Sequence, residues 1–115
     1  MFNRGNRGGF GFKEVTVQQA QEMLDKGEAV LIDVREPAEY TEVHAKNAKL
    51  MPLSTFPQHL GEIPQDKEVL LICRSGGRSA QAGMIAAQAG LKGIYNVQGG
   101  TLGWVQARLP TEKGS

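Results

Sequence analysis

The sequence predicts one α/β domain with a mainly parallel sheet and helices on both faces. Short apolar runs alternate along the chain with segments of helical periodicity, as in strands that are joined by helical crossovers. Two of these runs, Ala29–Ile32 and Val69–Cys73, are continuously apolar, which is typical of strands covered on both faces. The 115 residues are enough to bury a core, and neither a repeat nor a linker divides them.

The first twelve residues, MFNRGNRGGFGF, are predicted to be a flexible extension, and the domain then spans residues 13–115. Gly, Arg and Asn are frequent in this segment, a composition typical of flexible chain termini. An RNA-binding segment of the RGG type is the alternative interpretation. We favour it less, because the two arginines provide weak attraction for phosphate.

A short strand over Lys13–Val17 and a helix that begins beside Thr16 are the first predicted elements. Thr16 and Gln19 match a capping box, in which each side chain bonds to the backbone N–H group of the other residue. Gly27 is a natural stop for this helix. The face that we expect to be buried carries four apolar residues at helical spacing: Val17, Ala20, Met23 and Leu24.

The apolar run Ala29–Ile32 is the next predicted strand, and it ends in the polar segment Asp33–Arg35. A helix should follow, because Pro37 suits the first helical turn. This helix is expected to run through Ala38, Glu39 and Tyr40.

The middle of the chain is predicted to be irregular. Leu50–Leu53 is expected to form a short strand at an edge or an end of the sheet, because Pro52 cannot donate a ladder hydrogen bond. Ser54 is a candidate cap for a short amphipathic helix. The polar segment Gly61–Lys67 contains Pro64 and is predicted to be a loop.

The second half repeats the order of strand and helix. Val69–Cys73 is a strand, Ser79–Ala89 is an uncharged helix that should pack closely on the sheet, and Gly93–Val97 is the next strand. A glycine pair then makes a turn. A last helix is expected to begin at Thr101 and to end before Pro110.

Composition excludes several classes of partner. The 13 Lys and Arg residues against 12 Asp and Glu give a net charge of +1, so no overall field favours nucleic acid or a membrane surface. No apolar run approaches the length of about 20 residues that a membrane-spanning helix needs. The single cysteine excludes an internal disulfide and fits a reducing compartment, so a cytoplasmic protein is expected.

No metal and no cofactor are predicted. His, Cys and acidic residues do not cluster at the spacing of metal ligands, and the glycine pairs lack the strand context of a nucleotide fingerprint. His44 and His59 are poor candidates for a general base, because neither follows a predicted strand. His59 is expected to be exposed.

The strongest functional signal is the segment Cys73–Ser79, CRSGGRS, between a buried strand and a helix. Ligands of open α/β sheets bind beyond the carboxyl ends of the strands, where the next helix presents its first free N–H groups. The helix end and the guanidinium groups of Arg74 and Arg78 should favour the thiolate of Cys73 over the thiol. A small hydrophobic core residue is the alternative for a lone cysteine, but such a residue needs neither arginines nor glycines beside it.

We therefore interpret Cys73 as the catalytic nucleophile and the rest of the segment as its anion-binding loop. Small residues leave the backbone N–H groups free to converge on one point, and a guanidinium binds oxyanions with a planar fork. For the arginines, a solvated surface position is the alternative. The predicted substrate-binding residues are Arg74, Ser75, Gly76, Gly77, Arg78 and Ser79.

Four motifs in order resemble the rhodanese family of sulfurtransferases. The matching segments are CRSGGRS, LIDVRE with Glu39-Tyr40, His44 with Met51-Pro52-Leu53, and NVQGG with Trp104 and Leu109-Pro110. The resemblance covers about Val15 to Pro110 and implies a five-stranded parallel sheet with flanking helices. It also implies that Asp33 and Arg35 hold the loop and the following segment through hydrogen bonds or ion pairs. One region departs from the family, which usually has Gly-His-Ile and then Gly-Ala where this chain has Val43-His44-Ala45 and Asn47-Ala48.

The length of the loop separates two chemistries. Cys73 and Arg78 follow the spacing Cys-x4-Arg, whereas cysteine phosphatases have Cys-x5-Arg, a wider cradle for a tetrahedral phosphate. The shorter loop resembles the sulfur-handling branch, and a phosphatase or an arsenate reductase is the less favoured alternative.

We therefore expect Cys73 to take a sulfane sulfur from a small anionic donor, such as thiosulfate, or from a persulfide. The sulfur would be held as a Cys73 persulfide and passed to cyanide, a thiol or a protein acceptor. The rival interpretation is a non-catalytic module, which would carry persulfide sulfur for a partner enzyme or serve as an interaction domain.

Overall fold

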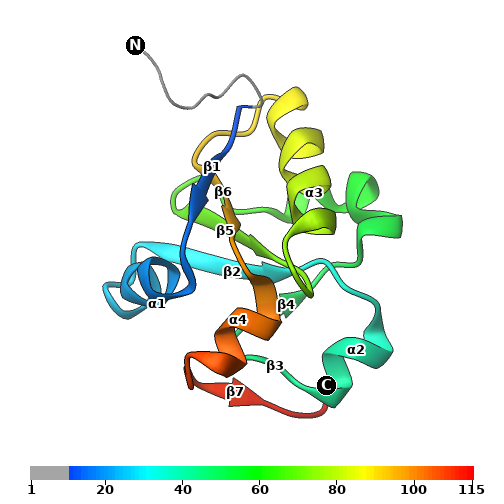
Figure 1. The fold of residues 1–115 in the computed structure, drawn as a ribbon. Helices are drawn as coiled ribbons and strands as arrows, with labels where there is room; N and C mark the ends of the chain where they lie inside the picture. Colours follow the sequence, from blue (N-terminus) through cyan, green and yellow to red (C-terminus); the bar gives the residue numbers. More distant parts are fainter. Residues whose placement is uncertain (1–10) are drawn as a thin grey trace.

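A computed structural model describes residues 11–115, which form a five-stranded parallel sheet with helices on both faces (Figure 1). The strand order is β1 (Lys13–Val15), β6 (Ile94–Val97), β5 (Glu68–Ile72), β2 (Ala29–Asp33) and β4 (Lys49–Leu50). Every pairing within this sheet is parallel, so the predicted fold class is confirmed. Most of the predicted N-terminal extension lies outside the described residues.

Helices and one small ribbon complete the chain. The helices are α1 (Val17–Asp25), α2 (Pro37–Glu42), the 3-10 helix η1 (Leu53–Glu62), α3 (Gly77–Gln88) and α4 (Gly100–Gln106). The ribbon is antiparallel and joins β3 (His44–Ala45) to β7 (Thr111–Glu112). Within residues 11–115, no helix is both long enough and apolar enough to cross a membrane.

The sheet separates two apolar clusters, because successive side chains of a strand point to opposite faces. On one face Leu70 of β5 is packed with Ala20 of α1 and Trp104 of α4. On the other face Leu71 of β5 is packed in a second cluster with Phe56 of η1 and with residues of α3. All of these side chains are buried, which explains why the strands read as continuous apolar runs rather than as alternating ones.

The N-terminal elements follow their sequence signals closely. The Thr16 hydroxyl accepts the N–H of Gln19, and the Gln19 side chain accepts the N–H of Thr16, as the capping box predicts. The strand is shorter than expected, because Val17 is already the first residue of α1. Phe12, the last residue of the predicted extension, packs against the buried cluster beside α3.

The prediction for residues 50–67 is partly wrong. Only Lys49 and Leu50 pair with β2, and β4 lies at the edge of the sheet, as Pro52 requires. The next helix begins at Leu53 after Pro52, so Ser54 is not its cap. It is a 3-10 helix that continues to Glu62. The loop therefore begins at Ile63, two residues after its predicted start at Gly61.

The turn that departs from the rhodanese pattern has a left-handed conformation at Asn47. Asn47 has a φ of 70°, in the region that glycine most readily adopts. Asparagine tolerates this region better than most residues, because its short side chain can bond locally. The ribbon that pairs β3, just before this turn, with β7 was not predicted.

Candidate active site

The sulfur of Cys73 lies at the carboxyl end of β5 and faces the loop that follows. The residue is 1 % exposed. Its Sγ atom accepts a hydrogen bond from the Gly76 N–H at 3.1 Å, and the Ser79 Oγ atom lies 3.3 Å from it. Burial on its own raises the pKa of this thiol, but hydrogen bonds from the Ser79 side chain and from the N–H groups of Ser79, Gly76 and Ser75 outweigh it. The net direction of the Cys73 pKa is below its ordinary value.

The carbonyl groups of Cys73 and Arg74 point the other way, toward α4. The Cys73 carbonyl accepts the Thr101 N–H at 2.8 Å and the Thr101 hydroxyl at 3.0 Å. The Arg74 carbonyl accepts the Leu102 N–H at 3.1 Å. With these carbonyls held by α4, the following N–H groups are turned toward the sulfur. Thr101 was expected only as a helix start, and its role in holding the loop was not predicted.

Glycine allows this close contact between the loop and α4. A Cβ atom on Gly100 would lie 2.5 Å from the Arg74 carbonyl oxygen and 2.6 Å from that of Cys73. Its φ of 56° is also unfavourable for a larger residue. Gly100 is the first residue of α4, one position earlier than the predicted start.

The helix α3 begins at Gly77, two residues before the predicted Ser79. Its cap is Gly76, with a φ of 117°, a conformation that glycine adopts without strain. The first turn of α3 therefore includes Arg78 and Ser79, whose N–H groups have no partner within the helix. The partial positive charge of this helix end lies beside the sulfur and favours an anion there.

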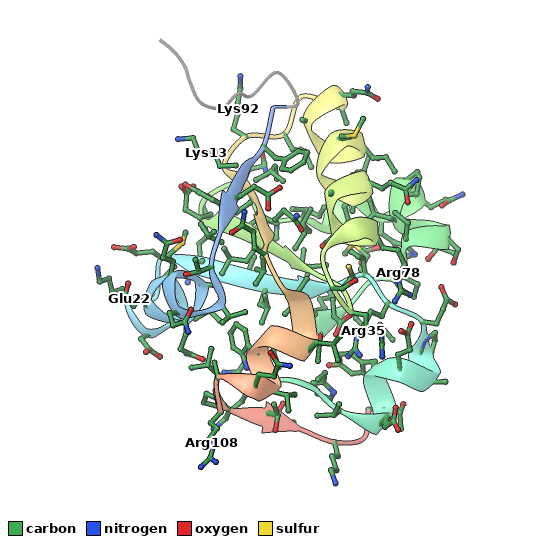
Figure 2. All side chains as sticks on the ribbon, in the orientation of Figure 1. Lys13, Glu22, Arg35, Arg78, Lys92 and Arg108 are labelled. Atoms are coloured by element: carbon green, nitrogen blue, oxygen red, sulfur yellow. The ribbon has the colours of Figure 1, made fainter. Side chains whose placement is uncertain are left out.

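Arg78 extends from α3 to α2, where it meets Glu39. Two of its nitrogens bond the carboxylate oxygens of Glu39 at 2.7 and 2.8 Å. This bond to Arg78 lowers the pKa of Glu39 to about 2, against a smaller opposing effect of burial. The guanidinium that was predicted to bind substrate thus has a partner already, and its ligand role stays a prediction. Figure 2 shows Arg78 and Arg35 on the same side of the molecule, toward α2.

Asp33 and Arg35 form a buried ion pair at the carboxyl end of β2. The Arg35 Nη2 atom lies 2.9 Å from the Asp33 carboxylate and donates to the Val43 carbonyl at 2.7 Å. The pair therefore ties the end of β2 to the segment that follows α2. Within residues 11–115, none of its hydrogen bonds reaches the loop Arg74–Ser79.

Asn96 of β6 lies behind the loop and was not singled out in the sequence. Its Oδ1 atom is 2.5 Å from the Ser79 Oγ atom. Its Nδ2 atom donates to both carboxylate oxygens of Glu14, at 3.0 and 3.2 Å, and to the Gly76 carbonyl at 3.3 Å. Asn96 is 4 % exposed. A polar residue inside a four-residue strand is the signal that could have identified it.

A cleft of about 330 Å³ adjoins the loop between α2 and α4. Arg74 lines it, and this side chain has no hydrogen-bonding or ionic partner within residues 11–115. Leu102 and Val105 form an apolar wall and are 43 % and 46 % exposed. Among the described residues, the cleft thus combines an unpaired cation of the loop with apolar surface of α4.

The two histidines lie away from the loop. His44 is buried in β3, stacks on the Tyr40 ring and bonds the Tyr40 carbonyl through Nδ1 at 2.7 Å. His59, which was expected to be exposed, is of intermediate burial, with 41 % of its side chain exposed, and it pairs with Glu62 in η1. Neither is hydrogen-bonded to a residue of the loop.

Comparisons with known proteins find similar sequences and similar structures. Residues 16–107 match the family described as the rhodanese-like domain. A sulfurtransferase of Allochromatium vinosum is 35 % identical over 79 % of this chain and 85 % of its own length. A thiosulfate sulfurtransferase, GlpE, of Glaesserella parasuis is 32 % identical over 90 % of this chain and 95 % of its own. The crystal structure of a rhodanese-related protein from Thermoplasma volcanium superposes with a TM-score of 0.81 at 27 % identity, covering 88 % of this chain and 98 % of that one.

Proposed function

The chain belongs to the rhodanese-like family, whose relatives are named sulfurtransferases, and from that premise we propose that it transfers sulfane sulfur through a persulfide on Cys73. Thiosulfate is the proposed donor for an assay. Cyanide or a thiol is the proposed acceptor. A thiol that must stay reduced fits a reducing compartment such as the cytoplasm.

The first step is a displacement at sulfur. The Cys73 thiolate attacks the outer sulfur of thiosulfate, the bond between the two thiosulfate sulfurs breaks, and sulfite leaves with its electron pair. The thiolate and the thiosulfate dianion carry three negative charges, as do the persulfide anion and the sulfite dianion that form. No proton has to move if the thiol is already ionised, so this step needs no general base.

One observation carries the proposal: Cys73 Sγ lies 3.1 Å from the N–H of Gly76 and 3.3 Å from the hydroxyl of Ser79. After the first step the negative charge lies on the outer sulfur, one bond farther from β5. The N–H groups at the start of α3 are suited to an anion in that place. The same loop therefore supports both the attacking thiolate and the persulfide.

The second step returns Cys73 Sγ to the thiolate state. A nucleophile attacks the outer sulfur, the sulfur–sulfur bond breaks, and Cys73 leaves as a thiolate. With cyanide the product is thiocyanate; with a thiolate it is a new persulfide. We propose that donor and acceptor approach through the cleft beside Arg74, whose guanidinium has no partner among residues 11–115 and suits a small anion.

Intact-protein mass spectrometry after exposure to thiosulfate tests this directly. We expect the mass to rise by that of one sulfur atom, and cyanide to remove it. Cys73→Ser should gain no sulfur and show no turnover, with an unchanged circular dichroism spectrum. Turnover by this variant near that of the wild type would overturn the assignment of Cys73.

A steady-state assay with thiosulfate and cyanide separates an enzyme from a carrier. Ping-pong kinetics with full turnover are expected for the enzyme. A persulfide that can be isolated but reacts slowly with both cyanide and small thiols would favour the carrier for a partner protein.

A further inference from the structure

A buried chain of hydrogen bonds leads from the surface residue Glu14 through Asn96 to Ser79 and the sulfur. The orientation of the Asn96 amide follows from its neighbours. Its Nδ2 group faces the Glu14 carboxylate and the Gly76 carbonyl, which can only accept hydrogen bonds. The reversed amide would set its oxygen against these acceptors. The Asn96 Oδ1 atom therefore faces Ser79 and can only accept from it.

Ser79 has a single hydroxyl hydrogen and two atoms that could accept it. Asn96 Oδ1 is 2.5 Å away, and Cys73 Sγ is 3.3 Å away. While Cys73 is a thiol, its own hydrogen can bond the Ser79 oxygen, and the Ser79 hydroxyl can bond Asn96. Once the sulfur is a thiolate it has no hydrogen to give, and it is stabilised only if the hydroxyl turns toward it.

We propose that Asn96 is a positioning residue that competes with Cys73 for the hydroxyl hydrogen of Ser79. Asn96 holds this hydrogen whenever Cys73 Sγ is uncharged, and the sulfur takes it when Sγ is a thiolate. The role of this exchange in the reaction rests on the proposed function. During sulfur transfer Sγ loses its charge when the persulfide forms, so the hydroxyl returns to Asn96 and leaves the outer sulfur to the backbone N–H groups.

The Ser79 and Asn96 variants leave the other charged groups around the loop unchanged. They come from β1, β2, the segment between β2 and α2, α2, the loop and α3, whereas α4 contributes no ionisable side chain. These groups are Glu14, Asp33, Arg35, Glu39, Arg74 and Arg78.

The rate of alkylation of Cys73 by iodoacetamide, followed from pH 4 to pH 10, reports its thiolate without any sulfur transfer. Ser79→Ala removes a donor to the thiolate, so the midpoint should move to higher pH. Asn96→Leu removes the competing acceptor, so the midpoint should move to lower pH. Below the wild-type midpoint, alkylation of Asn96→Leu should be about threefold faster, as expected for one ordinary hydrogen bond. The double variant should behave like Ser79→Ala, because Asn96 acts through Ser79.

Glu14→Ala tests the same competition for the Ser79 hydrogen without altering a buried residue. Without the carboxylate the Asn96 amide can turn its Nδ2 group toward Ser79, so the midpoint should again fall. In a Ser79→Ala background this effect should vanish, whereas a direct effect of the Glu14 charge on the thiolate would persist. Glu22→Ala, an exposed carboxylate of α1, is the matched control and should change nothing.

An upward shift in both Asn96→Leu and Ser79→Ala would overturn the proposal and leave Asn96 a structural support. So would a Glu14→Ala shift that survives in the Ser79→Ala background. Absence of turnover with thiosulfate and cyanide in the wild type would instead contradict the proposed function, and the order of the alkylation midpoints would still decide the role of Asn96.

Discussion

The guanidinium of Arg78 and the carboxylate of Glu39 form a two-point ion pair between α3 and α2. The two residues are 39 positions apart, and both side chains are about one-third exposed. An anionic substrate that binds Arg78 must therefore share this cation with Glu39 or displace the carboxylate. The pair limits how strongly the loop attracts an anion.

Glu39→Gln should improve the use of thiosulfate, because it frees Arg78 and removes a negative charge near the loop. We expect the KM for thiosulfate to fall about twofold to fivefold, the range of a partly exposed ion pair. Arg78→Ala should raise the KM, and steady-state kinetics at low ionic strength measure both. If neither variant changes the KM, Arg78 is part of the scaffold rather than a ligand.

The same pair predicts how stability depends on pH. The pKa of Glu39 is about 2 in the folded protein, below its ordinary value of 4.5. A depressed carboxyl pKa stabilises the fold above the unfolded pKa, and this contribution is lost as the pH falls toward the folded pKa. The difference in unfolding free energy between the wild type and Glu39→Gln should therefore shrink from pH 5 to pH 2. Urea denaturation across this interval measures it, and a constant difference would contradict the prediction.

Gly100→Ala should loosen the contact that turns the loop carbonyls away from the sulfur. The added Cβ would lie too close to the Arg74 carbonyl for either backbone segment to stay in place. Gly27→Ala is the matched control, since its φ of 72° is also left-handed but nothing lies within 4 Å of the new atom. The control should lose about 1 kcal/mol. Gly100→Ala should lose more in urea denaturation and also lose sulfur transfer. Equal stability losses would contradict this account of α4.

Arg35→Met should destabilise the fold by about 3–5 kcal/mol, because it leaves the buried Asp33 carboxylate without its partner. The double variant Asp33→Leu/Arg35→Met should recover part of this loss. For a supporting role, the kcat of the folded fraction of Arg35→Met should stay within about threefold of the wild type, in line with a residue that contacts no reacting atom. A much lower kcat at full folding would instead indicate direct participation.

A glycine inserted after Gly77 should weaken sulfur transfer. Ser79 and Gly76 reach Cys73 Sγ only because the loop is short, and one more residue moves the first turn of α3 away from the sulfur. Turnover of thiosulfate should fall about a hundredfold or more, the effect of losing one preorganised donor at a reacting centre. A glycine inserted after Asp66, in an exposed loop, is the control and should retain turnover.

Local signals in the sequence were sufficient to predict the main helices and strands. The capping box at Thr16 and the apolar run of β5 depend on neighbouring residues, and the structure confirms both. The two-residue strands β3, β4 and β7 are too short for periodicity to show. They form because tertiary contacts bring their backbones together, as when His44 meets Glu112.

The candidate site could be predicted only in part, again because some of its contacts join residues that are distant in the sequence. The loop Cys73–Ser79 is contiguous, so its residue types and spacing could be interpreted directly. The partners of this loop come from other elements: Glu39 from α2, Asn96 from β6 and Thr101 from α4. Each is separated from its partner by at least 17 residues, and nothing in the local pattern indicates the contact.

The last residues of the described chain are bound to the segment that follows β2. The Gly114 N–H donates to the Thr41 carbonyl of α2 at 2.7 Å, and β7 pairs with β3. Figure 1 accordingly places the C-terminus beside α2, the helix that carries Glu39. Trimming by a carboxypeptidase would therefore release one wall of the cleft beside Arg74 without touching a single residue of the loop. The intactness of the tail should be verified before rates from different preparations are compared.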